Sequence, residues 1–167
     1  MNAFFMEQKN KNYANSEYMV RTGEKIDSKR IWEIRNHPLS RQYSGNPEAI
    51  PWKQHQNWFE RKYFAGADNH FFVLEKSGEE TIGYCRLDFD SEHNHYIVSV
   101  AIDPQFHGQG LGNFLLSETI VKFNGSKNLA AEIQKENIVS VKLFQKNNFK
   151  ILSEDEKNYY LKYTYLN

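Results

Sequence analysis

VSVAIDPQFHGQGLGNFLL, residues 98–116, contains the strongest structural signal in the chain, because a strand pattern changes into a helix pattern within it. Apolar side chains recur at every second residue up to Ile102, as in a strand, and at helical spacing from Leu111 onward. The loop between them carries glycine at alternate positions, Gly108, Gly110 and Gly112. Glycine lets the main chain turn tightly and approach a ligand, and the first turn of a helix presents unpaired N–H groups. The loop is therefore predicted to bind phosphate groups.

Two familiar phosphate-binding loops do not match this one. No Lys-Ser or Lys-Thr pair follows the glycines, which excludes a Walker loop. Asn113 stands at the last glycine position of the dinucleotide-binding fingerprint, and the preceding strand belongs to a meander rather than to an opening βαβ unit. A glycine-rich loop is also compatible with a tight connection that binds nothing, so the surrounding segments have to decide.

Length and composition favour one soluble domain spanning residues 1–167. The 21 Lys and Arg residues balance the 21 Asp and Glu residues, so no net positive field indicates nucleic acid or an anionic membrane as a partner. The single cysteine, Cys85, excludes an internal disulfide and is expected to be an inert buried thiol. The N-terminal residues lack the pattern of a signal peptide and no apolar run has membrane-spanning length, which predicts a cytoplasmic protein.

The order of the expected elements indicates the fold class. They are, in chain order, a strand at 17–24, a helix at 27–36, a helix beginning at Pro51, strands at 70–76, 81–90 and 95–103, the helix after the glycine loop ending at Asn124 and Gly125, a strand at 129–133, a helix at 138–147 and a strand at 159–166. The three central strands form an antiparallel meander. The sequence therefore predicts an α+β fold with a mixed sheet and helices on its faces.

The segment VAIDPQFHGQGLGNFLL, residues 100–116, resembles the acetyl-CoA motif of the GCN5-related N-acetyltransferase (GNAT) superfamily, which reads Arg/Gln-x-x-Gly-x-Gly/Ala between a strand and a helix. Gln105 or His107 can begin the motif. We choose His107, because Pro104 and Phe106 then align better, although His107 departs from the usual Arg or Gln. An ordinary surface position is the alternative for His107.

This resemblance implies a mixed, mostly antiparallel central sheet flanked by about four helices, and acetyl-CoA as co-substrate without a metal. It implies that the main chain of Val100, Ala101 and Ile102 pairs with the pantetheine arm. It further implies that the pyrophosphate binds the loop formed by His107, Gly108, Gln109, Gly110, Leu111 and Gly112.

A second segment, AEIQKENIVSVKLFQKNNF at residues 131–149, resembles the other signature of the superfamily. It implies that Glu132 is the general base, with a strand glutamate on a solvated face as the alternative. It also implies that Asn137 and Ser140 lie at the donor site. Phe144 stands where many members have the tyrosine that protonates the leaving thiolate. Three candidates for the general acid therefore remain, namely Tyr84, Ser140 and a water.

Asn148 is a second departure from this signature. It replaces the usual glycine, which is a mild change because asparagine tolerates the left-handed conformation.

The acceptor is inferred from IWEIRNHPLSRQYSGNPEAIPWKQHQNWFERK, residues 31–62, within a recognition half at about 18–66 that precedes the donor-binding core at about 70–150. The segment resembles acetyltransferases of the pseudaminic-acid pathway, which act on nucleotide-linked amino sugars. The residues that carry this resemblance are Trp32, Arg35, Asn36, Arg41, His55, Trp58 and Phe59. Arginine suits a diphosphate and asparagine suits sugar hydroxyls, whereas His55, Trp58 and Phe59 also suit a protein core.

Several alternatives stay open from the sequence. The same segment looks, less closely, like enzymes that acetylate ribosomal-protein N-termini, and Phe144 is compatible with a non-catalytic acyl-CoA-binding module. The aromatic last strand is compatible with a homodimer interface. His93 and His95 suggest a metal, but no third ligand stands out in the neighbouring sequence, so a solvated hairpin is favoured.

Overall fold

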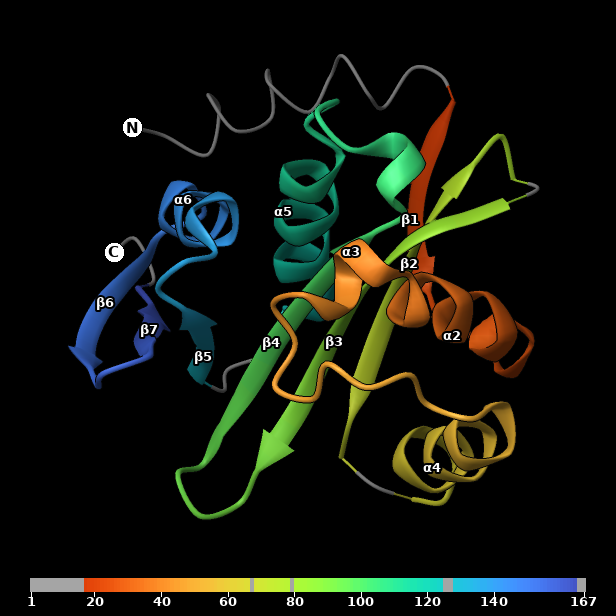
Figure 1. The fold of residues 1–167 in the computed structure, drawn as a ribbon, viewed down its shortest axis with the longest axis horizontal. Helices are drawn as coiled ribbons and strands as arrows, with labels where there is room; N and C mark the ends of the chain where they lie inside the picture. The colour runs from red at the N-terminus through yellow and green to blue at the C-terminus, as the bar shows by residue number, and fades with distance from the viewer. Residues whose placement is uncertain (1–16, 67, 79, 125–127, 165–167) are drawn as a thin grey trace.

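The computed structural model describes residues 17–66, 68–78, 80–124 and 128–164 (Figure 1). Their strands form one seven-stranded sheet in the order β1-β2-β3-β4-β5-β7-β6. The strands are β1 (Tyr18–Thr22), β2 (His70–Lys76), β3 (Glu80–Asp90), β4 (His95–Ile102), β5 (Asn128–Gln134), β6 (Phe149–Glu154) and β7 (Asn158–Tyr163). The α-helices are α2 (Ser28–Asn36), α3 (Pro38–Arg41), α4 (Trp52–Phe64), α5 (Leu111–Phe123) and α6 (Ile138–Lys146), and short 3-10 helices occupy Lys25–Asp27 (η1) and Pro104–Phe106 (η2).

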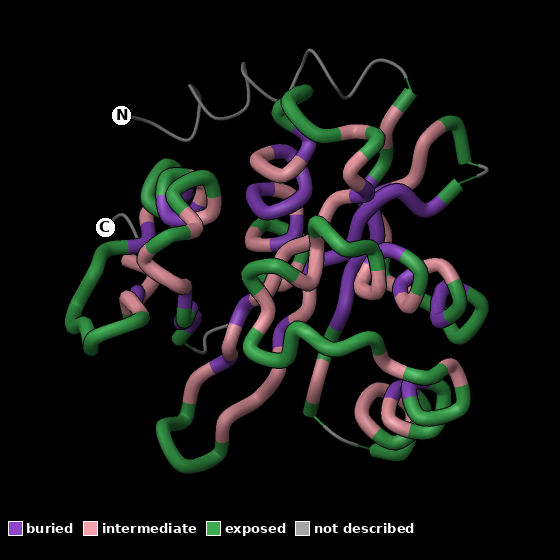
Figure 2. The backbone as a smooth tube through the Cα atoms, in the orientation of Figure 1, coloured by how far each residue is buried: buried purple, intermediate pink, exposed green. Residues whose placement is uncertain are grey.

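The sheet is mixed and mostly antiparallel, as predicted, because β4 and β5 are the one parallel pair among the described strands. Two apolar cores lie on its two faces (Figure 2). The larger core joins α5 and α6 to the sheet and includes Leu111, Leu115 and Phe144. The smaller core joins α2 and α4 to β2 and β3 and includes Ile34 and Phe59. The α+β class is therefore confirmed.

Local signals in the sequence account for several element boundaries. Asn124 ends α5 in the left-handed conformation with φ 39°, as predicted, while Gly125 lies outside the described residues. Pro51 precedes α4 as its N-cap residue rather than standing within its first turn. The carboxylate of Asp27 does not cap α2, because it binds the Arg21 guanidinium at 2.8 and 2.9 Å and the Thr81 hydroxyl at 3.0 Å.

Besides the short 3-10 helices η1 and η2, one strand and one helix of the described residues are not expected from the sequence. The strand β6 was missed because five of its six residues are exposed, so its sequence has no buried face to produce an alternating pattern. The helix α3 was missed because it is a single turn.

Cys85 is fully buried on β3, and burial raises the pKa of its thiol to about 12, in agreement with an inert thiol. None of the helices in the described ranges has the length and apolar character that crossing a bilayer requires.

Candidate active site

The edge of β4 is open where β4 and β5 separate. The two strands pair only at their first residues, from His95 with Asn128 to Ile97 with Ala130, whereas β4 stays paired with β3 as far as Ile102. Figure 1 shows β5, β6 and β7 set apart from the other four strands beyond this pairing. On the side away from β3, residues 98–102 therefore pair with no strand of the described residues, and the main-chain N–H and C=O groups on that side can pair with an extended ligand that carries amides.

The glycine-rich loop lies directly after this open edge. Gly108 and Gly110 have left-handed φ angles of 77° and 76°, a conformation that other residues rarely adopt. Gly110 is the N-cap residue of the 13-residue helix α5. Within the described part of the chain, the main-chain N–H groups of Gly108, Gly110, Leu111 and Gly112 have no hydrogen-bond acceptor. Free N–H groups at the positive end of a helix dipole form a site for an anion.

Gly112 differs from the other two glycines because it lies inside the first turn of α5. A side-chain Cβ at this position would lie 3.5 Å from Leu143 Cδ2 and 3.8 Å from Ile102 Cγ1, which are ordinary contact distances. In this loop, the left-handed backbone conformation that favours glycine therefore occurs at Gly108 and Gly110.

His107 ties the loop to the end of β4. Its Nε2 lies 2.9 Å from the carbonyl oxygen of Ile102, and because a carbonyl only accepts, Nε2 is the donor. The ring is otherwise exposed. His107 therefore positions the loop, a role that the sequence did not indicate.

Asn137 caps α6 beside the end of β5. Its side-chain oxygen accepts a hydrogen bond from the main-chain N–H of Ser140 at 3.1 Å, so its NH₂ group is left for other partners. Ser140 is half-buried in the first turn of the same helix.

Glu132 lies on β5 beyond the last residue that pairs with β4. Its neighbours Ala131 and Ile133 are buried, so the exposed Glu132 side chain points from the other face of the strand. Its Oε1 accepts a hydrogen bond from Asn158 Nδ2 at 3.0 Å. The placement is compatible with both interpretations made from the sequence, a base at the opening and a glutamate on a solvated face.

Phe144 belongs to the core. Its side chain is 2 % exposed and packs edge-on against Phe149, with the ring centroids 4.9 Å apart. Asn148, just before β6, has φ 65°, which confirms that it takes the left-handed position where glycine is usual. Tyr84, one candidate acid, is also buried, and burial raises the pKa of its hydroxyl.

Three residues expected to bind the acceptor hold the segment between α3 and α4. Asn36 exchanges two hydrogen bonds with the main chain of Ile50, at 2.8 and 2.9 Å. Arg35 donates from Nη2 to the Asn46 carbonyl at 2.9 Å, and Arg41 donates to the carbonyls of Asn36 and Pro47. These contacts give the segment a defined conformation over the face of α2.

His55 is an interior residue. It is 2 % exposed, stacks between Trp52 and Phe59, and donates from Nε2 to the Ser28 carbonyl at 3.0 Å. Burial lowers the pKa of its imidazole to about 4. His55 is therefore a core residue with a hydrogen-bond partner, which was the alternative to a role in binding the acceptor. The proposed acceptor site does not include it.

Arg35 and Arg86 form a positively charged cluster on the α2/α4 face of the sheet. Arg35 Nη1 and Arg86 Nε are buried and have no hydrogen-bond partner among the residues that the structure describes. Burial most of all, and the positive charges of Arg86 and Arg41, lower the pKa of the Arg35 guanidinium. The Arg86 guanidinium also lies 5.4 Å from the ring centre of Trp58 and 3.8 Å from Asp88. The alternation Tyr84, Arg86, Asp88 along β3 was the signal that could have placed Arg86 on this face.

Comparison with known proteins agrees with this architecture. The sequence profile described as the acetyltransferase (GNAT) family matches residues 29–149. The protein yncA of Salmonella typhimurium, solved with its cofactor acetyl-CoA, has a similar structure with a TM-score of 0.73 and 22% identity, covering 88% of this chain and 93% of that one. An N-acetyltransferase from Staphylococcus aureus Mu50 is 25% identical with a TM-score of 0.70, covering 89% and 97% of the two chains.

A ribosomal-protein-alanine N-acetyltransferase from Brucella melitensis shares the fold with a TM-score of 0.71 and 19% identity, covering 86% of this chain and 98% of that one. No curated protein matches the sequence significantly.

Proposed function

The chain belongs to the acetyltransferase (GNAT) family, and on this premise we propose that it acetylates the amino group of a nucleotide-linked amino sugar. The coarser part follows from the family: the protein is an acetyl-CoA-dependent N-acetyltransferase with acetyl-CoA as its co-substrate. We further propose that residues 1–167 act as one domain, in which residues 18–66 recognise the acceptor and residues 70–150 bind the donor.

The donor site is proposed at the open edge of β4 and the glycine-rich loop. The unpaired N–H groups of Gly108, Gly110, Leu111 and Gly112 suit a pyrophosphate. The unpaired edge at residues 100–102 suits the amides of a pantetheine arm, although His107 already uses the Ile102 carbonyl. The NH₂ group of Asn137 adds a donor at the start of α6.

The chemistry requires a neutral amine, a polarised thioester carbonyl and a leaving thiolate. In our proposal the amine nitrogen attacks the carbonyl carbon, and Glu132 takes the amine proton directly or through a water. The C–S bond then breaks and the thiolate of coenzyme A leaves. A cysteine-like thiol has a pKa of about 8.5, so the thiolate can leave near neutral pH without an acid at the position of Phe144.

The acceptor proposal rests on the cluster of Arg35 and Arg86. Each of these side chains has a buried N–H group without a partner in the described ranges, and such groups are costly unless a ligand satisfies them. A phosphate oxygen matches guanidinium donors in charge and geometry. Trp58, which already faces Arg86, offers an aromatic surface for a base or a sugar ring. A nucleotide diphosphate attached to an amino sugar carries both features.

Thiol release from acetyl-CoA tests the acceptor directly. The protein is offered a UDP-linked amino sugar, the same amino sugar without the nucleotide, and a peptide with an N-terminal alanine. We expect turnover with the UDP-linked sugar, and Arg86→Gln should raise its KM about tenfold or more while leaving the KM for acetyl-CoA unchanged. Arg61→Gln is the matched control, because Arg61 is an exposed arginine of α4 that, within the described residues, binds the Asn57 carbonyl alone.

Two results would contradict the acceptor proposal. One is equal turnover of the sugar with and without its nucleotide, and the other is turnover of the peptide alone.

The homodimer stays a prediction. In the described residues β7 lies between β5 and β6, so the aromatic last strand is not an edge of the sheet.

A further inference from the structure

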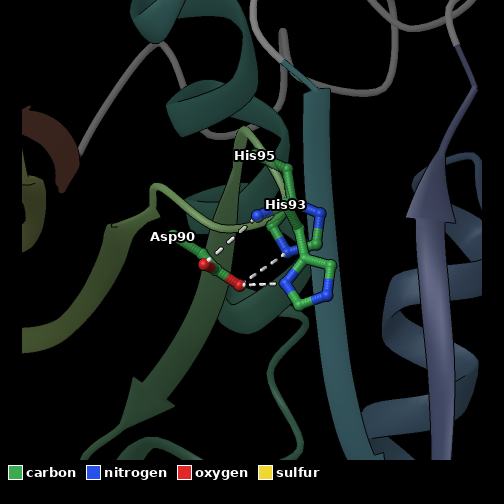
Figure 3. Close-up of side chains that lie close together, drawn as sticks. All are labelled: Asp90, His93 and His95. Carbon is green, nitrogen blue, oxygen red and sulfur yellow. Dashed lines mark hydrogen bonds and ion pairs between the residues drawn. The ribbon is translucent and has the colours of Figure 1, made fainter.

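The hairpin between β3 and β4 brings three metal-ligating side chains together. Asp90 is the last residue of β3, His93 lies in the turn, and His95 is the first residue of β4. One oxygen or nitrogen atom from each of them lies within 4.8 Å of the other two. Figure 3 shows both imidazole rings beside the Asp90 carboxylate. The sequence predicts Asp90 only as the last residue of a strand, and the fold makes it the third metal-ligating side chain of this group.

The turn itself fixes the Asp90 carboxylate. Its Oδ1 accepts hydrogen bonds from the main-chain N–H groups of Glu92 at 3.0 Å and His93 at 3.4 Å. Its Oδ2 is directed to the rings, 2.7 Å from His93 Nδ1 and 3.5 Å from His95 Nε2. One carboxylate oxygen therefore builds the turn and the other faces both histidines.

His95 supplies an independent indication of a missing partner. Its Nε2 atom is buried and has no hydrogen-bond partner in the described part of the chain, although it lies 3.5 Å from the Asp90 carboxylate oxygen. A buried polar atom without a partner is unfavourable unless a ligand satisfies it. His93, by contrast, is 61 % exposed, so an ion can reach the cluster from solvent.

We propose that Asp90, His93 and His95 bind a divalent transition-metal cation, with Zn²⁺ as the representative ion. Two imidazoles and one carboxylate are ligands that Zn²⁺ accepts, and a fourth position would be left to water. Bond lengths of about 2.0–2.1 Å put the ligand atoms of a tetrahedral site about 3.3 Å apart. The 3.5 Å between Asp90 Oδ2 and His95 Nε2 already agrees with this separation.

Binding requires only a small rearrangement at His93. The ion replaces the proton that Nδ1 of His93 shares with Asp90, and this proton passes to solvent. The distance between His93 Nδ1 and Asp90 Oδ2, now 2.7 Å, then lengthens. The rings of His93 and His95 are nearly parallel, with centroids 5.4 Å apart, so both nitrogens can turn to one ion. Of the charged neighbours, Glu92 favours a cation and Lys162 opposes it.

The site is separate from acetyl transfer. His95 and Ile102 are the two ends of β4, which at about 3.3 Å per residue puts them roughly 23 Å apart. The ion would join the ends of β3 and β4 and hold the hairpin closed, without a part in the reaction.

The test is calorimetric titration of the untagged full chain with ZnCl₂ at pH 7.5, after treatment with EDTA. We expect one Zn²⁺ per chain, and we expect His93→Gln and His95→Gln each to weaken binding about tenfold or more. Zn²⁺ at 100 times its dissociation constant should raise the melting temperature of the wild type by roughly 5–10 °C, and at the same concentration should raise that of His93→Gln by about half as much or less.

His70→Gln is the matched control, because His70 lies 3.4 Å from the single carboxylate of Asp68 and belongs to no group of three ligands in the described residues. Its Zn²⁺ affinity should equal that of the wild type. Melting curves in EDTA show whether each variant is folded, and the exposed His93 is the safer of the two changes. A titration without saturable binding, or stoichiometric binding that survives His93→Gln, would overturn the proposal.

Discussion

The Nε2 atom of His107 lies 2.9 Å from the carbonyl oxygen of Ile102, which joins the glycine-rich loop to the end of the open strand β4. The two residues belong to the two parts of the proposed donor site, the loop for the pyrophosphate and the strand edge for the pantetheine arm. His107 thus holds the two parts in register through a hydrogen bond, whereas the usual Arg or Gln at this position is absent.

Removing this hydrogen bond should weaken donor binding. One hydrogen bond contributes about 0.5–1.5 kcal/mol, so His107→Ala should raise the KM for acetyl-CoA roughly 2- to 12-fold with little change in kcat. Gln carries its NH₂ group near the position of Nε2, and His107→Gln should restore most of the affinity. Initial rates at varied acetyl-CoA measure both variants. Equal KM values for the wild type and His107→Ala would show that the contact does not order the loop.

Gly110 should be required for its conformation. An alanine at φ 76° costs about 1–2 kcal/mol and would shift the N–H groups at the start of α5. We therefore expect Gly110→Ala to lower the melting temperature and to remove most of the stabilisation by acetyl-CoA, which is about 2.7 kcal/mol at 100 times the dissociation constant. Thermal melts with and without acetyl-CoA measure both effects.

Gly66→Ala is the control for this change. Gly66 has φ 85° and open space around it at the end of α4, so it carries the same conformational cost away from the loop. It should lower the melting temperature but keep the response to acetyl-CoA. The assignment of the glycine-rich loop as the donor site would be contradicted if Gly66→Ala lost its stabilisation by acetyl-CoA, or if Gly110→Ala kept all of it.

Glu132 should act as the general base. Glu132→Gln keeps the size of the side chain and its acceptor for Asn158, but it cannot take a proton. We expect kcat to fall about 100-fold or more while the KM for acetyl-CoA stays nearly unchanged. Glu136→Gln, an exposed change in the same segment, should have no effect. A Glu132→Gln enzyme with normal kcat across the pH range would exclude this role.

Restoring a tyrosine at position 144 should destabilise the protein rather than improve catalysis. Phe144 is buried against Phe149, so the added hydroxyl would lie in an apolar site without a partner. The expected cost is about 1–3 kcal/mol in the free energy of unfolding, or roughly 2–10 °C in melting temperature. Phe64→Tyr, at a half-buried ring near the end of α4, should cost less. A Phe144→Tyr variant that is as stable as the wild type and turns over faster would refute this expectation.

The protein should lose stability between pH 6.5 and pH 4 because of His55. Burial lowers the pKa of its imidazole from 6.5 to about 4, so the unfolded chain takes up this proton first as the pH falls. The contribution of neutral His55 is complete above pH 6.5 and is lost progressively toward pH 4, by up to about 3 kcal/mol. His55→Gln keeps a donor for the Ser28 carbonyl, and its free energy of unfolding should fall less over this range. Denaturant unfolding at several pH values gives the comparison, and parallel curves would contradict the prediction.

The elements with strong local patterns were predictable from the sequence. The meander of β2, β3 and β4 follows from alternating apolar residues and turn-forming tips, and the start of α5 follows from the glycines before its leucines. Asn148 could also be placed, because the left-handed conformation depends on the residue itself and its neighbours. The edge strand β6 could not be predicted, because nearly all of its residues are exposed. Its sequence therefore lacks the alternation of apolar and polar residues by which a strand is recognised.

Long-range packing decided the features on which the proposals and predictions above depend. No local sequence pattern predicts that β5 separates from β4 after Ile97. The same holds for the approach of Arg86 to Arg35 and for the burial of Phe144. Local chain geometry depends on a few neighbouring residues, so the sequence alone determined the glycine-rich turn between a strand and a helix, and the order of its elements determined the fold class. Strand pairing and side-chain burial depend on residues far apart in the chain, and only the assembled sheet brings their charges and hydrogen-bonding groups together.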